Sequence, residues 1–417
     1  MAPPAPPSEA DDRPAGGRAL RSLPPRPPAS SPPPPASAVA QHTLGSMDGW
    51  STALALLAGV ANGSYPLFLK TAAVLAADIH MIVFQSFKST TLLLLGLVLV
   101  GSQALVATAD YTFTWWAVAG AAAWIPSGLT TIAAVPMIGM GPTMLTAAGT
   151  GTVVSFFVGW LALGEPLRHH HTSTGSTFVL APMYLLGILL GMVGLVFAPQ
   201  IFYDAAASKE THEESDTARV FPTDHVLCAS QHDPRPLEQG SVPQTRARKA
   251  ASALRPFGYF LAASSGGFAS LQYLIVTLAQ RNLPVDSVAL DPLGSWTLSF
   301  AIGAVVWTMV AAGVFAALNR FAHVPTWRRR AIWKVVAIPG LGAGLFWCGG
   351  NLLSTLAVER GGNAVTVATY QTANLITSGM WGLLFYHEFR GRAAVAWALS
   401  AAFTMVMVLL LALEKGH

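Results

Sequence analysis

The sequence predicts an all-α integral membrane protein with ten transmembrane helices, arranged as two inverted five-helix repeats. Of the 417 residues, 53% are hydrophobic and only 11% are charged, and the mean hydropathy is +0.49. Soluble proteins carry about 25% charged residues, so this composition excludes a soluble fold of the same size. Two further observations complete the prediction: ten apolar stretches of membrane-spanning length, and a match between the two halves of the chain.

The first 48 residues form a segment of different composition. They hold 13 of the 29 prolines, including four in a row at 32–35. A segment so rich in proline and so poor in large apolar residues cannot bury a core. No apolar stretch of signal-peptide type follows its arginines, so a cleaved signal peptide is not expected. We expect residues 1–48 to be a disordered, proline-rich tail.

The apolar stretches that follow are each about 20 residues long, which is the helix length needed to cross roughly 30 Å of hydrocarbon. A membrane-spanning strand would need only about 10 residues in strict alternation, and these stretches do not alternate. Several have tryptophan near an end, where indole rings favour the membrane interface. The predicted spans are 50–70, 80–102, 115–137, 142–164, 178–200, 256–279, 294–318, 333–357, 364–386 and 393–413.

A polar insert at 201–255 separates the fifth span from the sixth and contains Glu213, Glu214 and Arg246. We expect it to be disordered, with a first five-helix repeat at 49–200 and a second at 256–413. The protein is predicted to be multi-pass, in an organelle or the plasma membrane. Arginines in the short loops favour a non-cytosolic amino terminus, whereas those of the tail favour a cytosolic one. The charges therefore leave the orientation open.

The two halves match without a gap when 124–165 is shifted by 223 positions onto 347–388. Eleven pairs are then identical, and pairs such as Trp124/Trp347 and Glu165/Glu388 are difficult to obtain from shared apolar composition alone. Because each half has an odd number of spans, the second copy enters the membrane in the opposite sense. Inverted repeats of this kind are a known transporter architecture, with the substrate site near midplane between the halves.

The motifs of the repeat resemble a known family. The resemblance rests on Trp124-Ile125-Pro126-Ser127-Gly128, Val135-Pro136, Gly139-Met140-Gly141, Trp347-Cys348-Gly349-Gly350-Asn351 and the run from Trp381 to Gly391. Asn62-Gly63-Ser64-Tyr65-Pro66 also resembles a Gly-Ser-x-x-x-Pro element, although the proline comes earlier here. Together they are similar to the drug/metabolite transporter superfamily, in its glucose/ribose porter and transmembrane-protein-144-like branch. This resemblance implies the drug/metabolite transporter fold and a carrier for carbohydrate or a related polar metabolite that works by alternating access.

Polar side chains inside the spans are the candidate substrate ligands. Tyr370 and Asn374 belong to a stripe that recurs every three or four residues in the ninth span, which places them on one helix face. Lipid offers such groups no hydrogen bonds, so they must face another helix or a wet cavity. An amide such as Asn351 can bind a sugar hydroxyl, and an indole offers a face for a pyranose ring. The full predicted set is Asn62, Tyr65, Lys88, Trp124, Thr146, Gln272, Trp347, Asn351, Tyr370 and Asn374. For each of them, structural packing is the alternative.

Three charged residues have separate interpretations. Lys88 is the one ionisable side chain well inside a predicted span, and intramembrane charge indicates a functional site. If it points inward it favours an anionic substrate, and if its span is shifted it can extend toward water. Glu165 and Glu388 each end a Gly-x5-Glu element that begins at Gly159 or Gly382. Their symmetry predicts a structural or gating role at helix ends.

The function predicted from these residues is a secondary transporter for a small polar solute, with a sugar as the first candidate. The absence of Asp or Glu near the centre of any predicted span favours a facilitator or exchanger over a proton-driven carrier. The alternatives are a carrier of the same superfamily for nucleotide-sugars, sugar phosphates, drugs or amino acids, and a membrane-embedded enzyme. We expect no enzymatic activity, no cofactor, no metal and no nucleic-acid partner. The lipid bilayer is the expected environment, and homo-oligomerisation is left open.

Overall fold

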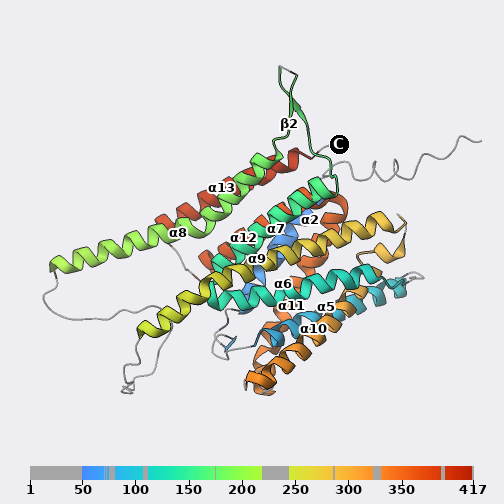
Figure 1. Cartoon of the computed structure of the whole chain (residues 1–417), viewed down its shortest axis with the longest axis horizontal. Helices are drawn as coiled ribbons and strands as arrows, with labels where there is room; N and C mark the ends of the chain where they lie inside the picture. Colours follow the sequence, from blue (N-terminus) through green and yellow to red (C-terminus); the bar gives the residue numbers. More distant parts are fainter. Residues whose placement is uncertain are drawn as a thin grey trace, which may run out of the picture.

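The computed structural model describes residues 49–69, 71, 73–74, 80–106, 111–173, 175–217, 244–284, 287–322, 330–386 and 390–415. Across these residues the chain is almost entirely α-helical (Figure 1). The helices are α2 (Gly49–Ser64), α3 (Pro66–Leu69), α5 (Met81–Val106), α6 (Trp115–Ile138), α7 (Met140–Phe157), α8 (Ala181–Thr217), α9 (Gln244–Asn282), α10 (Ser295–Ala322), α11 (Arg330–Gly361), α12 (Asn363–Leu384) and α13 (Arg392–Leu413). The all-α prediction is confirmed.

Eight helices within the described residues are long and apolar enough to cross a membrane. They are α5, α6, α7 with its π-helical extension η1 (Val158–Ala162), α8, α9, α10, α11 and α13. The protein is therefore of the multi-pass membrane type. Helix α2 is only 16 residues long, and α12 is less apolar because of its threonines and amides. These two helices occupy the predicted first and ninth spans, and the count of ten spans stays a prediction.

Three segments depart from the predicted pattern. The first span is interrupted at Tyr65, and α3 begins at Pro66, because proline has no N–H to donate and suits the first position of a helix. Helical structure enters both ends of the predicted insert 201–255, since α8 continues to Thr217 and α9 begins at Gln244. Both extensions contain good helix formers such as alanine. Residues 218–243, and the predicted tail at 1–48, lie outside the described residues.

A short hairpin lies in the loop after η1. Strands β1 (His170–His171) and β2 (Thr177–Phe178) pair antiparallel, with His170 opposite Phe178. The segment around residue 414 closes against it: His170 Nε2 lies 2.8 Å from a carboxylate oxygen of Glu414, and the Arg168 N–H donates to the Glu414 carbonyl. Lys415 Nζ donates to the carbonyl of Gly361, at the end of α11. The hairpin and the α13 end are thereby tied to the α11–α12 turn.

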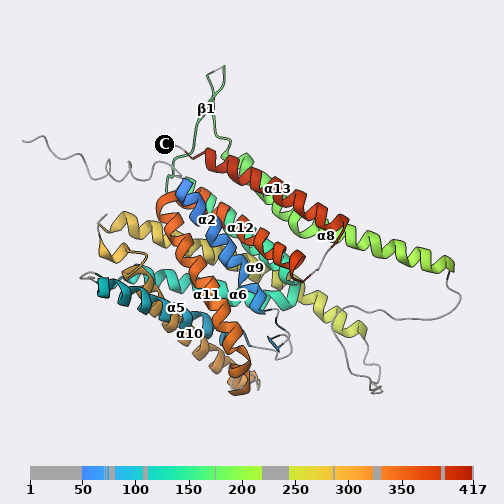
Figure 2. The same cartoon turned by 180° about the vertical axis from the view of Figure 1, so that it is seen from behind.

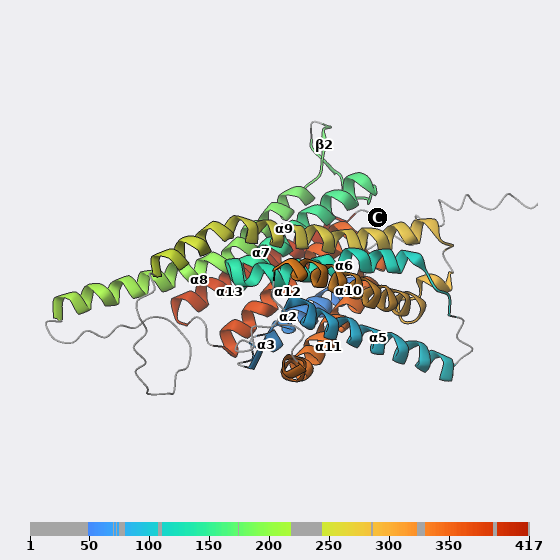
Figure 3. The same ribbon diagram turned by 60° about the horizontal axis from the view of Figure 1, so that its bottom comes forward.

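The helices form a bundle with two peripheral pairs. Helices α8 and α13 lie side by side along one edge, and α5 and α10 lie along the opposite edge (Figures 1 and 2). Between them are α2, α6, α7, α9, α11 and α12, which Figure 3 shows from another side. The peripheral helices turn many large apolar side chains outward, such as Leu190, Met309 and Leu399. An apolar outer surface of this kind suits contact with lipid.

The packing partners in one half correspond to those in the other. The contact of α6 with α9 corresponds to that of α11 with α2, and the contact of α7 with α9 corresponds to that of α12 with α2. Likewise, the contact of α6 with α10 corresponds to that of α11 with α5. Helices α7 and α12 run antiparallel: the start of α12 adjoins η1, and the start of α7 shares a cavity with the last turns of α12. Glycines at matching breaks, Gly139 and Gly362, have φ of +87° and +74°.

Close approach between α2 and α12 depends on Gly59. A Cβ atom at this position would lie 2.7 Å from the Tyr370 carbonyl oxygen and 2.8 Å from the Asn374 nitrogen. Both are backbone atoms of α12, so they cannot rotate away as a flexible side chain can. We therefore predict that Gly59→Ala forces α2 and α12 apart, with a cost in unfolding free energy of about 1–3 kcal/mol, as overpacking usually has.

Thermal unfolding of the purified protein in detergent measures this effect. The control is Gly349→Ala, because a Cβ at Gly349 on α11 meets no atom within 4 Å. Equal unfolding temperatures for the two variants would contradict the predicted close approach.

Candidate functional site

Lys88 lies inside the bundle with its ammonium over aromatic rings. It is the eighth residue of α5, about 10 Å along the helix from its first residue, and it is only 3% exposed. Its Nζ lies 4.1 Å from the ring centroid of Trp347, 5.3 Å from that of Trp124 and 5.4 Å from that of Tyr65. We call these three rings the aromatic cage. The side chain therefore points inward rather than toward water.

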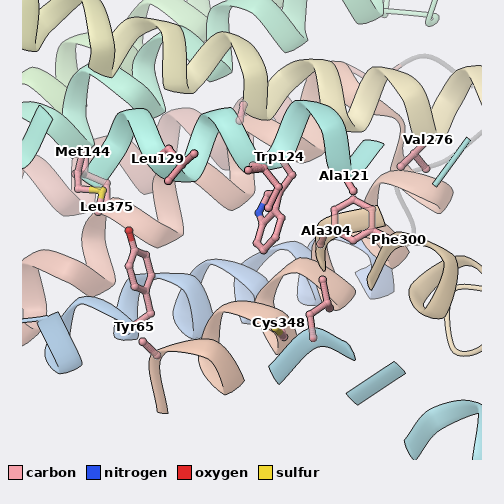
Figure 4. Close-up of a cluster of buried hydrophobic side chains, with 14 of the residues drawn as sticks. Tyr65, Ala121, Trp124, Leu129, Met144, Val276, Phe300, Ala304, Cys348 and Leu375 are labelled. Carbon is pink, nitrogen blue, oxygen red and sulfur yellow. The ribbon is translucent and has the colours of Figure 1, made fainter. Parts of the chain in front are cut away.

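The two indoles of the cage are also in contact with each other. The ring centroids of Trp124 on α6 and Trp347 on α11 are 3.9 Å apart, with an angle of 34° between the ring planes. Trp124 is buried and also packs against Phe300 of α10. Figure 4 shows its indole directed from α6 toward the side of the bundle where Cys348 lies. Two residues that the internal match pairs thus meet at the junction between the halves.

Gln85 extends the polar part of this site. It lies three residues before Lys88 on the same face of α5 and is fully buried. A Cβ on Gly128 would lie 2.6 Å from Gln85 Oε1 and 3.6 Å from Lys88 Nζ, so the absence of a side chain on α6 makes room for both. Neither amide atom of Gln85, nor Trp124 Nε1, has a hydrogen-bond partner in the described structure. Buried polar atoms are normally paired, so this group of unpaired atoms is unusual.

A second group of polar side chains surrounds Tyr370 of α12. Asn62 Nδ2 donates to its hydroxyl oxygen at 3.3 Å, which links α2 to α12. The ring of Tyr273 from α9 meets that of Tyr370 edge to face, with centroids 6.0 Å apart. Asn62 Oδ1 and Asn374 Oδ1 are buried and have no partner within the described residues.

This second group continues along α9 and α11. Gln272 Nε2 donates to Asn351 Oδ1 at 2.7 Å, and the hydroxyls of Tyr273 and Ser354 lie 2.8 Å apart. The amides of Gln272 and Asn351 therefore satisfy each other in part. All four side chains are buried, so the hydrogen bonds are shielded from water.

The structure brings most predicted site residues into these two groups. Tyr65, Lys88, Trp124 and Trp347 form the first, and Asn62, Gln272, Asn351 and Tyr370 make the hydrogen bonds of the second. Asn374 shares the α12 segment with Tyr370. Thr146 does not join them: it is half-buried on α7 and takes part in none of these contacts. The predicted set of site residues does not include Gln85 or Ser354, although the three-residue spacing from Lys88 and from Asn351 places them on the same faces.

Glu165 caps the start of α12 from the other half of the chain. Its two carboxylate oxygens accept the backbone N–H groups of Asn363 and Ala364, each at 2.8 Å. These amides belong to the first helical residues, which have no partner within the helix. A carboxylate there also interacts favourably with the helix dipole. Gly159 and Gly362 leave the space that the carboxylate fills. Its predicted partner Glu388 lies outside the described residues.

A cavity of about 430 Å³ lies at the opposite end of α12. Its walls include Gly63 and Pro66 near the α2–α3 break, Gly141 at the start of α7, and Ser378, Trp381 and Gly382 on α12. Trp381 Nε1 donates to Ser64 Oγ at 2.9 Å beside it. Gly63, which follows Asn62 in the chain, therefore lines this cavity. At the other end of α12, Glu165 holds the first turn by hydrogen bonds, and a second cavity of about 430 Å³ between α7 and α9 is lined in part by Asn363.

The arrangement provides one positive charge, flat aromatic faces and several hydrogen-bonding atoms. These are the means of binding a polar solute. Within the described residues, no group of three or more His, Cys, Asp or Glu side chains is placed to hold a metal ion.

Comparisons with known proteins leave the family open. Neither models of known protein families nor curated proteins match this chain. One solved structure, described only as "Crystal structure of protein", is similar with a TM-score of 0.47 and 17% identity, and the alignment covers 86% of this chain and 98% of the other. A likeness at this level carries no functional argument. The resemblance to the drug/metabolite transporter superfamily therefore remains a prediction.

Loss of the Glu165 cap should loosen the start of α12. We predict that Glu165→Leu speeds amide hydrogen exchange at Asn363 and Ala364 by roughly tenfold, because removing a helix cap costs about 0.5–2 kcal/mol. Glu165→Gln keeps an acceptor oxygen and should restore much of the protection. Hydrogen-exchange mass spectrometry of the peptide that covers the α11–α12 turn measures the difference. Unchanged exchange in Glu165→Leu would contradict the capping role.

Proposed function

We propose that the protein is a secondary transporter of carbohydrate or a related small polar metabolite. In this proposal two inverted five-helix halves rock about a central site and expose it to each side of the membrane in turn. The site consists of the aromatic cage around Lys88 and the hydrogen-bonded group around Tyr370.

One observation carries the proposal: buried polar atoms without partners gather where the two halves meet. Asn62 Oδ1 and Gln85 belong to the first half, and Asn374 Oδ1 belongs to the second. A fold that needed these groups only for packing would be expected to pair them, because an unsatisfied buried polar atom costs about 1–3 kcal/mol. A polar solute with several hydroxyls can donate to the oxygens and accept from the amide, which a lipid tail cannot do.

The inverted arrangement is supported by the equivalence of packing partners in the two halves. Exchanging α2 with α9, α5 with α10, α6 with α11, α7 with α12 and α8 with α13 converts the principal helix contacts into one another. The antiparallel directions of α7 and α12 fit a second copy that is inverted relative to the first. The positive-φ glycines Gly139 and Gly362 also occupy matching positions between consecutive helices.

Alternating access is supported by a contact between the two halves at the start of α12. At its start, Glu165 of the first half holds the backbone of Asn363 and Ala364 in the second half. At its other end, a cavity of about 430 Å³ separates α12 from the start of α7. A contact between the halves at one end of a helix, with a cavity at its other end, suits a carrier whose halves move relative to each other.

Uptake into proteoliposomes tests the proposed function directly. The full chain is reconstituted and supplied with labelled glucose, ribose, glucose 6-phosphate and UDP-glucose, with protein-free vesicles as the baseline. A carrier accumulates at least one of these solutes and shows counterflow when vesicles are preloaded with the same unlabelled solute. Absence of counterflow with every solute would contradict a carrier for this class of compound.

Two substitutions test whether the polar group around Tyr370 binds the solute. Asn351→Ala removes an amide, and Tyr370→Phe removes the hydroxyl that accepts from Asn62. We predict that each raises the half-saturating solute concentration about tenfold, because one buried hydrogen bond is worth roughly 1–1.5 kcal/mol. Protein yield should be unchanged.

The matched controls are Asn282→Ala, at the exposed end of α9, and Tyr184→Phe on α8. Both should transport as the unmodified protein does. If Asn351→Ala or Tyr370→Phe lowers yield while the remaining protein transports normally, that residue serves packing instead.

A further inference from the structure

We propose that the solute is an anion whose carboxylate or phosphate pairs with Lys88 inside the aromatic cage. This inference rests on the proposed transporter function and narrows its substrate class. It is drawn from the charge at the site and from the hydrogen-bond donors around that charge.

Lys88 makes no ion pair or hydrogen bond through its ammonium with any residue that the structure describes. No carboxylate of these residues lies within 4 Å of Nζ, and the residue is only 3% exposed. An uncompensated charge inside a membrane protein is costly, and such residues are normally paired or face a water-filled path. The described residues therefore provide no negative charge to pair with Lys88, and an anionic ligand can provide it.

The aromatic cage fixes the ammonium but does not neutralise it. Cation–π contacts with Trp347, Trp124 and Tyr65 offset only part of the free energy lost by burying an ion. An ammonium carries three N–H donors, and ring faces are weak substitutes for oxygen acceptors. The cage thus holds Lys88 in place while its N–H donors stay available.

Other hydrogen-bond donors without partners belong to residues close to Lys88. Gln85 Nε2 and Trp124 Nε1 are buried and unpaired within the described residues. Beside Gly128, Lys88 Nζ and Gln85 Oε1, which is an unpaired acceptor of the same amide, lie next to the same stretch of α6. Ammonium, amide and indole N–H groups all donate, and a carboxylate or phosphate has several oxygens that only accept. A neutral sugar could fill some of these hydrogen bonds but would leave the charge of Lys88 uncompensated.

The polar group around Tyr370 offers a separate place for the rest of the solute. Asn62 Oδ1 and Asn374 Oδ1 are unpaired acceptors, which suit hydroxyl donors rather than an anion. Tyr65 follows Asn62 by three residues near the end of α2, so the two groups are joined through that helix. A compound with an anionic group at one end and hydroxyls at the other matches both groups.

Thermal unfolding of the full chain in detergent tests the inference. The probes are inorganic phosphate, gluconate and glucose 6-phosphate, against neutral glucose and mannitol at matched ionic strength. We expect at least one anion to raise the unfolding temperature, since a ligand of the folded state stabilises it. Gluconate and glucose 6-phosphate distinguish a carboxylate from a phosphate ligand.

The variants are Lys88→Met, Lys88→Arg and Gln85→Leu, with Lys334→Met on an exposed position of α11 as the matched control. Lys88→Met should raise the anion concentration for a half-maximal shift by more than about tenfold, because the bound anion loses its buried charge partner. Lys88→Arg should retain part of the response, and Lys334→Met all of it. If Lys88→Met fails to fold, Gln85→Leu must still weaken the anion response.

Two results would overturn the inference. One is that no anion raises the unfolding temperature, whether or not glucose does, and the other is that Lys88→Met responds to anions as the unmodified protein does. The vesicle experiment separates this failure from that of the proposed function. Uptake of neutral glucose that persists in Lys88→Met would support the carrier function and contradict the anion site. Anion binding that depends on Lys88, without uptake of any solute, would contradict the carrier function and support the anion site.

Discussion

The stack of Trp124 on Trp347 is the contact on which the centre of the molecule depends. It joins α6 to α11 and offers the ring faces over which Lys88 is held. A buried lysine is tolerated here because the indoles provide a weakly polar surface in place of water. Gly128, one turn after Trp124, leaves the space in which Gln85 and Lys88 fit. In the motif Trp124-Ile125-Pro126-Ser127-Gly128, the indole therefore contacts Lys88 and the glycine leaves space for the Lys88 and Gln85 side chains.

Hydrogen bonding without water explains how the helices are distributed. Polar side chains are concentrated on α2, α12 and the facing sides of α9 and α11, where they can bond to one another. The peripheral helices α8, α13, α5 and α10 carry the apolar surface instead. Helix α12 is buried along most of its first three turns and can therefore be less apolar than a lipid-facing span. For the same reason, hydropathy is a weaker guide to α12 than to its neighbours.

Much of the fold could be predicted from the sequence because apolar length and helix-breaking residues determine where the helices lie. Predicted spans such as 115–137 and 393–413 agree with α6 and α13 within one residue at each end. The break at Tyr65 and the helical continuation past residue 200 were not predicted, since both depend on local backbone preferences within otherwise continuous patterns. In the site, periodicity identified Tyr370 and Asn374 on one face. It could not show that Lys88 points toward two tryptophans from other helices, because that contact joins segments far apart in the chain. Thr146 had the right chemistry, but its helix holds it away from both groups.

The ties around Glu414 and Lys415 have a consequence for the order in which the protein is made. The carbonyl of Gly361, at the turn before α12, accepts a hydrogen bond from Lys415. In the segment after η1, the Arg168 N–H donates to the Glu414 carbonyl, and His170 pairs with the Glu414 carboxylate. Both partners are synthesised only after α13, while chains fold as they emerge from the ribosome. The hairpin and the turn must therefore wait, incompletely bonded, until translation has passed position 415. Folding of these two distant segments is completed together, by the same late stretch of polypeptide.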